Sequence, residues 1–418
     1  MVGPVLLGLS QQAELDKGVI DVNRQNGRVS LSIMIGARMP TTKWVAPTVA
    51  MFSFLLINMS CKKQTITWGG TIKEVDGVTI VMNPRVPMLG ESAFSIEETL
   101  SIGSKDGGRE YTFAEIADLG VDEEGNIYVL DSRDALIKVF NNVGSYIRTI
   151  GRRGQGPGEM QRPTNLAMAP ANQILVNDRG ARVLQVFGRD GKYHRSISLA
   201  RSSTSFFSRP KVDSQNNIVA RSTFFKEDGK ASFVLAKYDA DMNELFRVFT
   251  YEYLVLPNTR NVYPPDCFWA ISNRDSLIWG YSNKYELLVL DKNGRIMRKI
   301  IQDYEPLEIT TKEKEEWARF AFGDQGVPSN IKVNWPDHHN AFNYLEVDDS
   351  GKIFVQTYKK AENTGAYYYD VFDPEGRYLA QVPLNAAPRA IKKDSIYTVE
   401  EDDDGYHHVK RYKINWKT

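Results

Sequence analysis

The stretch Asp122-Glu-Glu-Gly-Asn-Ile-Tyr-Val-Leu-Asp131 decides the fold, because the chain repeats its pattern five more times. A second hairpin, Val139-Phe-Asn-Asn-Val-Gly-Ser-Tyr-Ile-Arg-Thr-Ile150, follows it directly. In both segments, apolar runs flank a turn of Asp, Asn and Gly, and Gly and Asn accept the positive φ angles that tight hairpins require. Repeats with a period of roughly 40 to 50 residues are typical of propellers and solenoids.

The repeats also fix the number of units. The six first hairpins occupy residues 122–130, 169–176, 213–220, 272–279, 348–355 and 391–398. The complete second hairpins centre on residues 141–144, 188–191, 239–243, 291–294 and 373–376. The sixth unit ends at Ile414 and is one strand short, whereas Thr99 to Gly103 parallels Thr149 to Gly151. The sequence therefore predicts an all-β, six-bladed β-propeller, closed by an N-terminal strand that removes its open edges. An open solenoid would need polar caps at both ends, and the sequence has none.

Two regions interrupt the period. Residues 305–322 predict a surface helix between the fourth and fifth blades, with an N-cap at Thr310 or Thr311 facing Glu313 or Lys314. Trp317, Phe320 and Ala321 are expected on one side of this helix. Residues 62–91 form a lead-in before the propeller of residues 92–418, and residues 77–82 predict a strand on the outside of the ring.

Composition and charge indicate an ordinary globular protein and do not favour a nucleic-acid-binding one. The 418 residues are 42% hydrophobic and 25% charged, as in an ordinary globular protein. Lys plus Arg and Asp plus Glu both number 52, so the basic excess of a nucleic-acid-binding protein is missing and no nucleic-acid partner is expected. Cys61 and Cys267 do not form a metal or disulfide pattern, and Cys267 is expected to be a small buried residue.

The N-terminal segment indicates export. Residues 44–57 form an uncharged apolar run after Arg38 and Lys43, too short to cross a bilayer core of about 30 Å comfortably. Ser60 and Cys61 resemble the end of a bacterial lipoprotein signal, although Asn58 stands where that pattern prefers Leu. We therefore interpret residues 39–61 as a lipoprotein-type signal with lipid attachment at Cys61; a plain signal peptide or an uncleaved anchor is the alternative. Residues 1–38 are interpreted as a non-native upstream extension.

The loop Gly151-Arg-Arg-Gly-Gln-Gly-Pro-Gly-Glu-Met-Gln-Arg-Pro163, followed by Asn165-Leu-Ala, resembles the NHL repeat. From about Gly77 to the end, the chain resembles the bacterial six-bladed β-propeller lipoproteins related to NHL proteins. The resemblance implies a binding or scaffold propeller in the cell envelope, anchored to a membrane and facing the periplasm or the cell surface. Such a propeller would recruit a protein, peptide or glycan at the channel mouth. Most members have no assigned reaction, so the resemblance leaves enzymatic activity open.

Candidate binding residues lie where the innermost strands begin. Arg152, Arg153 and Arg162 could bind a carboxylate, sulfate or phosphate through their forked donors, or they could be solvated arginines on a rigid loop. His338 and His339 precede the innermost strand of the fifth blade and could ligate a channel Ca or Zn ion. A metal-dependent propeller lyase or lactonase is thus the alternative function. Because His338 has no inner-strand histidine partner in the sequence, we expect no metal, no cofactor and no catalytic residue.

Three further segments are weaker candidates. Asp239 to Glu244 resembles the start of a calcium loop but lacks its Gly and distal Glu, so a turn is expected. Residues 400–405 predict a solvated acidic hairpin. Tyr367-Tyr-Tyr369 lies on an outer strand, where its rings pack between blades or present a sugar platform. The sequence contains no Gly-x-Ser-x-Gly elbow, P-loop or HExxH motif.

Overall fold

The computed structural model describes residues 67–90, 93–199, 204–362 and 364–416, together with the backbone of one N-terminal hairpin. The chain divides into two compact units, residues 1–63 and 64–418. In the first unit the hairpin pairs β1 (Val22–Gln25) with β2 (Arg28–Leu31). The rest of the expected upstream extension, the expected signal segment 39–61 and Cys61 lie outside the described residues.

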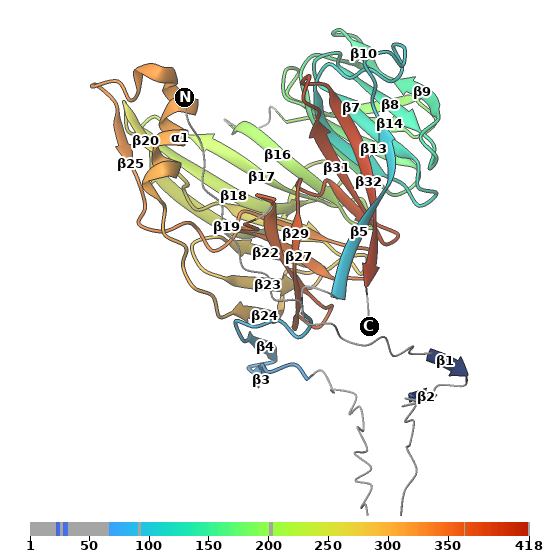
Figure 1. Cartoon of the computed structure of the whole chain (residues 1–418). Helices are drawn as coiled ribbons and strands as arrows, with labels where there is room; N and C mark the ends of the chain where they lie inside the picture. Colours follow the sequence, from blue (N-terminus) through green and yellow to red (C-terminus); the bar gives the residue numbers. More distant parts are fainter. Residues whose placement is uncertain are drawn as a thin grey trace, which may run out of the picture. The chain divides into compact units, whose positions relative to one another are not determined.

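The second unit contains six blades, each with four antiparallel strands (Figure 1). Blade 1 contains β6 (Ile116–Val121), β7 (Ile127–Asp131), β8 (Leu136–Phe140) and β9 (Tyr146–Ile150). Blade 2 contains β12 (Pro163–Ala169), β13 (Gln173–Asp178), β14 (Val183–Gly188) and β15 (Tyr193–Ser198). Blade 3 contains β16 (Thr204–Val212), β17 (Ile218–Phe225), β18 (Lys230–Tyr238) and β19 (Glu244–Leu254).

The second half of the ring repeats this order. Blade 4 contains β21 (Cys267–Ile271), β22 (Leu277–Tyr281), β23 (Glu286–Leu290) and β24 (Ile296–Gln302). Blade 5 contains β26 (Tyr344–Val347), β27 (Ile353–Lys360), β28 (Tyr367–Phe372) and β29 (Tyr378–Leu384). Blade 6 contains β30 (Ala390–Lys392), β31 (Ser395–Glu401), β32 (His407–Trp416) and β5 (Phe94–Ile102). Each innermost strand contacts that of the next blade, and β30 contacts β6. The predicted six-bladed propeller is confirmed.

Ring closure depends on β5, as the repeat count predicts. This strand pairs antiparallel with β32 from Val409 opposite Ile102 to Trp416 opposite Phe94. The outermost strand of blade 6 therefore comes from the N-terminal side of the unit and the three inner strands from its C-terminal end. Val409 is fully buried in this blade.

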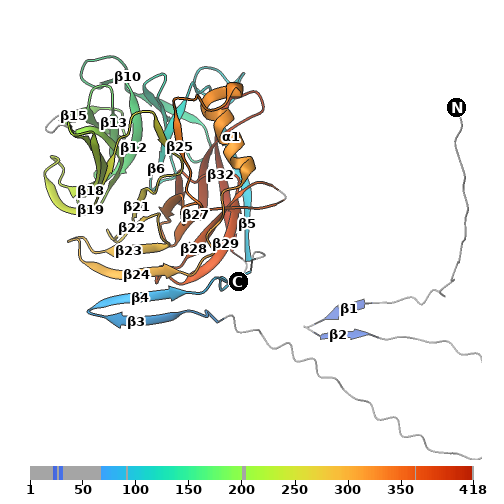
Figure 2. The ribbon, with the colours of Figure 1, turned by 90° about the vertical axis from the view of Figure 1, so that its left-hand side faces the viewer.

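The lead-in adds two strands to the outside of blade 4 (Figure 2). Strand β4 (Val78–Asn83) pairs in parallel with β24, and β3 (Thr71–Val75) pairs antiparallel with β4. Asn83 ties this edge to blade 5, because its amide donates to the Gly376 carbonyl at 2.9 Å and its oxygen accepts from the Tyr378 N–H at 2.7 Å. The strand expected at residues 77–82 is therefore present, and it links two blades.

The recurring Asp residues build turns. In blade 1, Asp122 Oδ1 accepts hydrogen bonds from the backbone N–H of Glu124 and of Asn126. Asp239 accepts in the same way from Asp241 and Asn243, and Asp402 accepts from Asp404 and Tyr406. An Asp at this position satisfies turn donors that would otherwise lack a partner. The Asp239 segment and the acidic segment 400–405 are thus hairpin turns.

An insertion between blades 4 and 5 carries helix α1 (Thr311–Phe322), followed by the 3₁₀-helix η2 (Gly323–Gln325). The predicted capping box is present, because the Thr310 side chain accepts from the Glu313 N–H and the Glu313 side chain accepts from the Thr310 N–H. Trp317 packs on Phe322 and on Trp335. The expected apolar side of α1 is wrong for Phe320, which is 91% exposed. A short parallel pair, β20 (Thr259–Asn261) and β25 (Lys332–Asn334), supports the insertion.

Candidate functional site

A ring of side chains, one from each blade, surrounds a central cavity. In blades 1 to 5, one residue of the innermost segment stands four positions before the start of the predicted first hairpin, and blade 6 contributes Arg389, just before β30. These six residues are Asp118, Asn165, Arg209, Phe268, Tyr344 and Arg389, and all of them line a central cavity of about 120 Å³. The propeller therefore brings together six side chains of quite different chemistry from six blades.

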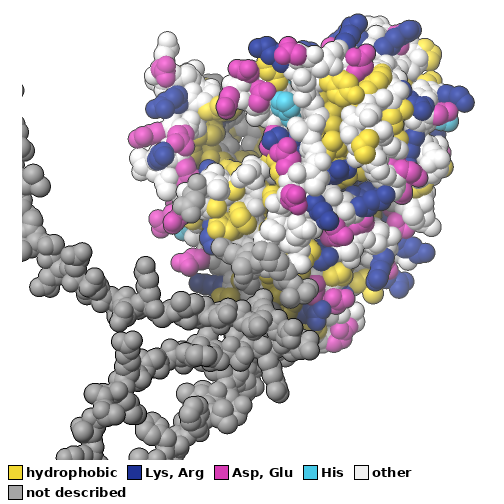
Figure 3. All heavy atoms as spheres, turned by 45° about the vertical axis from the view of Figure 1, so that its right-hand side comes forward, with side chains coloured by type: hydrophobic (Ala, Val, Ile, Leu, Met, Phe, Trp, Pro, Cys, Tyr) yellow, Lys and Arg dark blue, Asp and Glu magenta, His cyan; other side chains and the backbone are white. Residues whose placement is uncertain are grey.

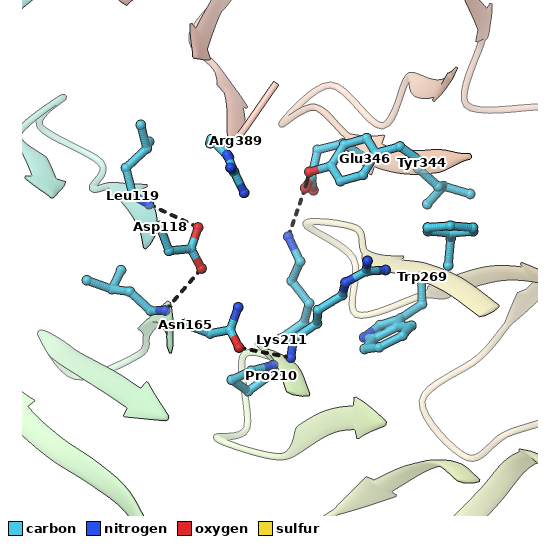
Figure 4. A pocket seen from close by; sticks show the side chains of 13 residues that line it. Asp118, Leu119, Asn165, Pro210, Lys211, Trp269, Tyr344, Glu346 and Arg389 are labelled. Atoms are coloured by element: carbon cyan, nitrogen blue, oxygen red, sulfur yellow. Dashed lines mark hydrogen bonds and ion pairs between the residues drawn. The ribbon is translucent and has the colours of Figure 1, made fainter. Parts of the chain in front are cut away.

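The channel is strongly polar (Figure 4). Lys211 Nζ of blade 3 lies 2.8 Å from Glu346 Oε2 of blade 5, so this ion pair reaches across the channel. Asp118 accepts the backbone N–H of Leu119 at 2.9 Å and that of Leu166 at 3.1 Å, while burial raises the pKa of its carboxyl above the usual value. Figure 4 shows Arg389 projecting into the same space from blade 6. The lining of the central cavity thus holds three cations (Arg209, Lys211 and Arg389) and two carboxyl groups (Asp118 and Glu346).

Arg209 reaches the channel mouth because the backbone of β16 is irregular there. The pairing of β16 with β17 shifts register between Ser208 and Lys211, and Arg209 has φ +52°. A positive φ is energetically costly for a residue other than glycine, and the following Pro210 further restricts the backbone of Arg209. Asn165 Oδ1 supports the bulge by accepting the Arg209 N–H at 3.4 Å. Bulges of this kind re-aim a side chain, and strained residues of this kind cluster at binding sites.

Two open grooves meet at Arg209 on the face where the innermost strands begin. The first, here named the mouth groove, has a volume of about 520 Å³. It is lined by Arg209, Arg221, Phe233, Tyr263, Pro264, Pro265, Asp266, Phe268, Ser282, Asn340, Asn343, Tyr344, Gln356 and Tyr358. The second, here named the arginine groove, has a volume of about 430 Å³ and runs between blades 2 and 3. It is lined by Thr164, Asn165, Arg179, Phe206, Phe207, Ser208, Arg209, Arg221, Thr223, Phe225, Phe233 and Tyr253.

An aromatic stack forms one wall of the mouth groove. His339 packs against Tyr263 and Tyr358, with ring centroids 4.9 Å and 4.4 Å away, and the two tyrosine rings are themselves 5.8 Å apart. Its Nε2 lies 3.0 Å from Glu313 Oε1, which connects the wall to helix α1. Burial lowers the pKa of His339 below its usual value despite this neighbouring carboxylate. His339 therefore holds the insertion against blade 5, and the Tyr263 and Tyr358 rings face the groove.

The residues expected to bind a ligand lie on the same face but line neither groove nor the central cavity. Arg152 and Arg153 form β10, which pairs in parallel with β11 (Glu159–Met160) inside the connecting loop. Arg152 is held by Glu159 at 2.7 Å, whereas Arg153 and Arg162 are exposed. His338 is also exposed and forms an isolated backbone bridge with Glu308. A ligand role for these four residues stays a prediction.

Charged side chains of both signs are mixed over the face shown in Figure 3, without a large area of one sign. Among the described residues, no group of three or more His, Cys, Asp or Glu side chains is placed to hold a metal ion. In that part of the chain, no helix is long and apolar enough to cross a membrane.

The chain is similar to one protein family and to several solved structures. A model of the DUF5128 family, described as a 6-bladed beta-propeller, matches residues 110–408. The solved structure of a putative exported protein from Bacteroides fragilis is similar, with a TM-score of 0.51 and 13% identity over 81% of this chain and 100% of that chain. A DUF4221 family member from Bacteroides vulgatus has a TM-score of 0.48 and 12% identity over 78% and 100% of the two chains. A streptogramin B lyase has a TM-score of 0.40 and 12% identity over 78% and 99%. No curated protein matches the sequence.

Proposed function

The chain belongs to the DUF5128 family of six-bladed β-propellers, and on that premise we propose that it is a binding protein of the bacterial cell envelope. Its ligand is a protein, peptide or glycan that carries a carboxylate and enters the channel mouth. The observation that carries this proposal is the position of Arg209 where the central cavity, the mouth groove and the arginine groove meet.

The chemistry of Arg209 supports a bound anion. Its guanidinium lies over the Phe268 ring, 5.2 Å from the centroid, and has no hydrogen-bond or ion-pair partner among the described residues. A guanidinium presents five donors in a planar fork that matches a carboxylate, so a bound anion would satisfy donors that the fold leaves open. Neighbouring Arg221 differs, because it already forms an ion pair with Asp266. Arg209 is therefore the anchor that we assign to the ligand.

We expect Arg209→Gln to weaken binding of carboxylated ligands at least tenfold, because a hydrogen bond to a charged group contributes about 1.5–3 kcal/mol. The probes are a glutamate-rich peptide and tetragalacturonate, measured by isothermal titration calorimetry on the purified propeller. Arg133→Gln is the matched control, since Arg133 is exposed and lines neither groove nor the central cavity. Equal affinities of Arg209→Gln and the native protein would remove Arg209 from the site.

We also propose that the native protein is lipid-anchored through Cys61, supported by the apolar run 44–57 and by the Ser60-Cys61 pair. Acyl chains bind membranes because each buried CH₂ contributes about 0.8 kcal/mol. In the native host, Cys61→Ser is expected to move the protein from the membrane fraction to the soluble fraction and to abolish incorporation of radiolabelled palmitate. Cys267→Ser is the control, because Cys267 is buried in blade 4. An unlabelled native protein would favour a plain signal peptide instead.

A further inference from the structure

The arginine groove and its continuation at the mouth contain three arginines that each lie on an aromatic ring. The guanidinium carbon of Arg179 is 3.9 Å from the Phe206 centroid. Arg221 lies 4.7 Å from the Phe233 centroid, and Arg209 lies over Phe268. Stacking on a ring fixes the guanidinium plane and leaves its N–H edges free to bind an anion. Arg179 and Arg209 are therefore preorganised donors, each with an apolar surface beside it, whereas Arg221 already pairs with Asp266.

The charge of the arginine groove is unusual for this chain. Its described lining contains Arg179, Arg209 and Arg221 and no acidic side chain. The carboxylate nearest to these arginines in the contacts described is Asp266, which pairs with Arg221 and lines the mouth groove. The whole chain has a formal net charge of zero, so this concentration of positive charge is local. Complementarity of charge therefore favours an anionic ligand.

Aromatic rings form the remaining surface of the same groove. Phe206 and Phe225 meet edge to face at 5.9 Å and are 37% and 45% exposed. Phe233 stacks on Tyr253, with centroids 5.2 Å apart. Exposed rings that line a groove are characteristic of ligand sites, because burying them removes apolar surface from water. The groove is also lined by hydroxyl and amide side chains, a type of group that exchanges hydrogen bonds with sugar hydroxyls: Thr164, Asn165, Ser208 and Thr223.

We propose that the ligand is an acidic oligosaccharide whose uronic-acid carboxylates bind the stacked arginines and whose sugar rings lie on the adjoining aromatic side chains. A uronic acid carries a carboxylate and an apolar C–H face on one ring, which matches an arginine and an exposed aromatic side chain within a few ångströms of each other. A glutamate side chain offers the carboxylate without that face. The inference rests on the proposed function, because it uses Arg209 as the point at which both grooves meet.

Calorimetry on the purified propeller tests this inference with four anionic probes, each tetrauronide being compared with its neutral tetrasaccharide. Three are tetrasaccharides of galacturonate, mannuronate and glucuronate, and the fourth is tetraglutamate. We expect at least one tetrauronide to bind, and the neutral tetrasaccharide of the same sugar to bind at least tenfold more weakly. Arg179→Gln and Phe206→Ala are each expected to weaken binding of the tetrauronide at least tenfold, whereas Arg133→Gln leaves its affinity unchanged, because Arg133 is exposed and lines neither groove. Thermal unfolding followed by circular dichroism verifies that each variant is folded.

Two outcomes separate the inference from the proposed function. If tetraglutamate binds with Arg209-dependent affinity while no tetrauronide binds, the ligand is an acidic peptide and only the glycan inference is overturned. The inference also fails if a tetrauronide binds Phe206→Ala as tightly as it binds the native protein. It fails as well if the native protein binds the neutral tetrasaccharide as tightly as the tetrauronide. If none of the four probes binds the native protein, both the inference and the carboxylate site at Arg209 are rejected.

Discussion

A chain that begins at Gly103, and so lacks β5, is expected to lose cooperative folding. Blade 6 would then have three strands, and the whole of β32 would become an unpaired edge. The deletion also removes Phe94 and Ile102, which are 9% and 2% exposed. Burial of two such side chains contributes about 3–6 kcal/mol, a large share of the roughly 5–15 kcal/mol that stabilises a domain. Thermal unfolding followed by near-ultraviolet circular dichroism measures the loss.

A chain that begins at Ala93 is the matched control. It lacks β3 and β4 but keeps β5, so blade 4 returns to four strands and the ring still closes. We expect this chain to melt cooperatively at a lower temperature than the native protein, because it loses the Asn83 bonds to blade 5. If both truncated chains melt alike, pairing of β5 with β32 is not what closes the propeller.

Hydrophobic and turn patterns were sufficient to predict the blades, because each blade is a local unit. Two apolar runs around an Asp-based turn form a hairpin wherever they occur. Thr99 to Gly103, which repeats the pattern of Thr149 to Gly151, indicates the strand that completes the blade ending at Ile414. Helix α1 was predictable for the same reason, since its capping box involves only Thr310 and Glu313. The exposure of Phe320 was not, because it depends on how the insertion lies on the propeller.

The candidate site was harder to predict, because its side chains come from six different blades and meet only when the ring closes. Counting four residues back from Asp122, Ala169, Asp213, Ser272 and Asp348 gives five of the six channel residues, so the repeat register already contained this signal. The sixth, Arg389, precedes a shorter turn. The proposed role of Arg209 in anion binding could not be predicted from this register. It depends on a bulge, on a positive φ before a proline and on packing against Phe268, none of which has a local sequence pattern.

Lys237→Met is expected to destabilise the propeller by about 3–5 kcal/mol, because it leaves a buried carboxylate without its counter-charge. Lys237 Nζ lies 2.8 Å from Asp213 Oδ2, and the two side chains are 4% and 1% exposed. Lys237 also donates to the Lys292 carbonyl of blade 4 at 3.2 Å, so the pair couples neighbouring blades. Methionine preserves most of the side-chain volume, which isolates the charge from a cavity effect. Urea unfolding at neutral pH measures the change in free energy of unfolding.

The dependence of this loss on pH identifies its cause. Burial alone would raise the pKa of Asp213, but the ion pair with Lys237 and hydrogen bonds from Asn217 outweigh it, so the pKa lies below the usual value. The stabilisation is therefore complete above the pKa of an unfolded Asp, about 3.9, and disappears as the pH falls through the lower folded pKa. The difference in free energy of unfolding between the native protein and Lys237→Met should be greatest at neutral pH and should become smaller below about pH 4. Adding Asp213→Asn to Lys237→Met removes the unpaired charge and is expected to recover at least half of the lost free energy of unfolding. If the loss is independent of pH and is not recovered in this double variant, the effect comes from packing and not from charge.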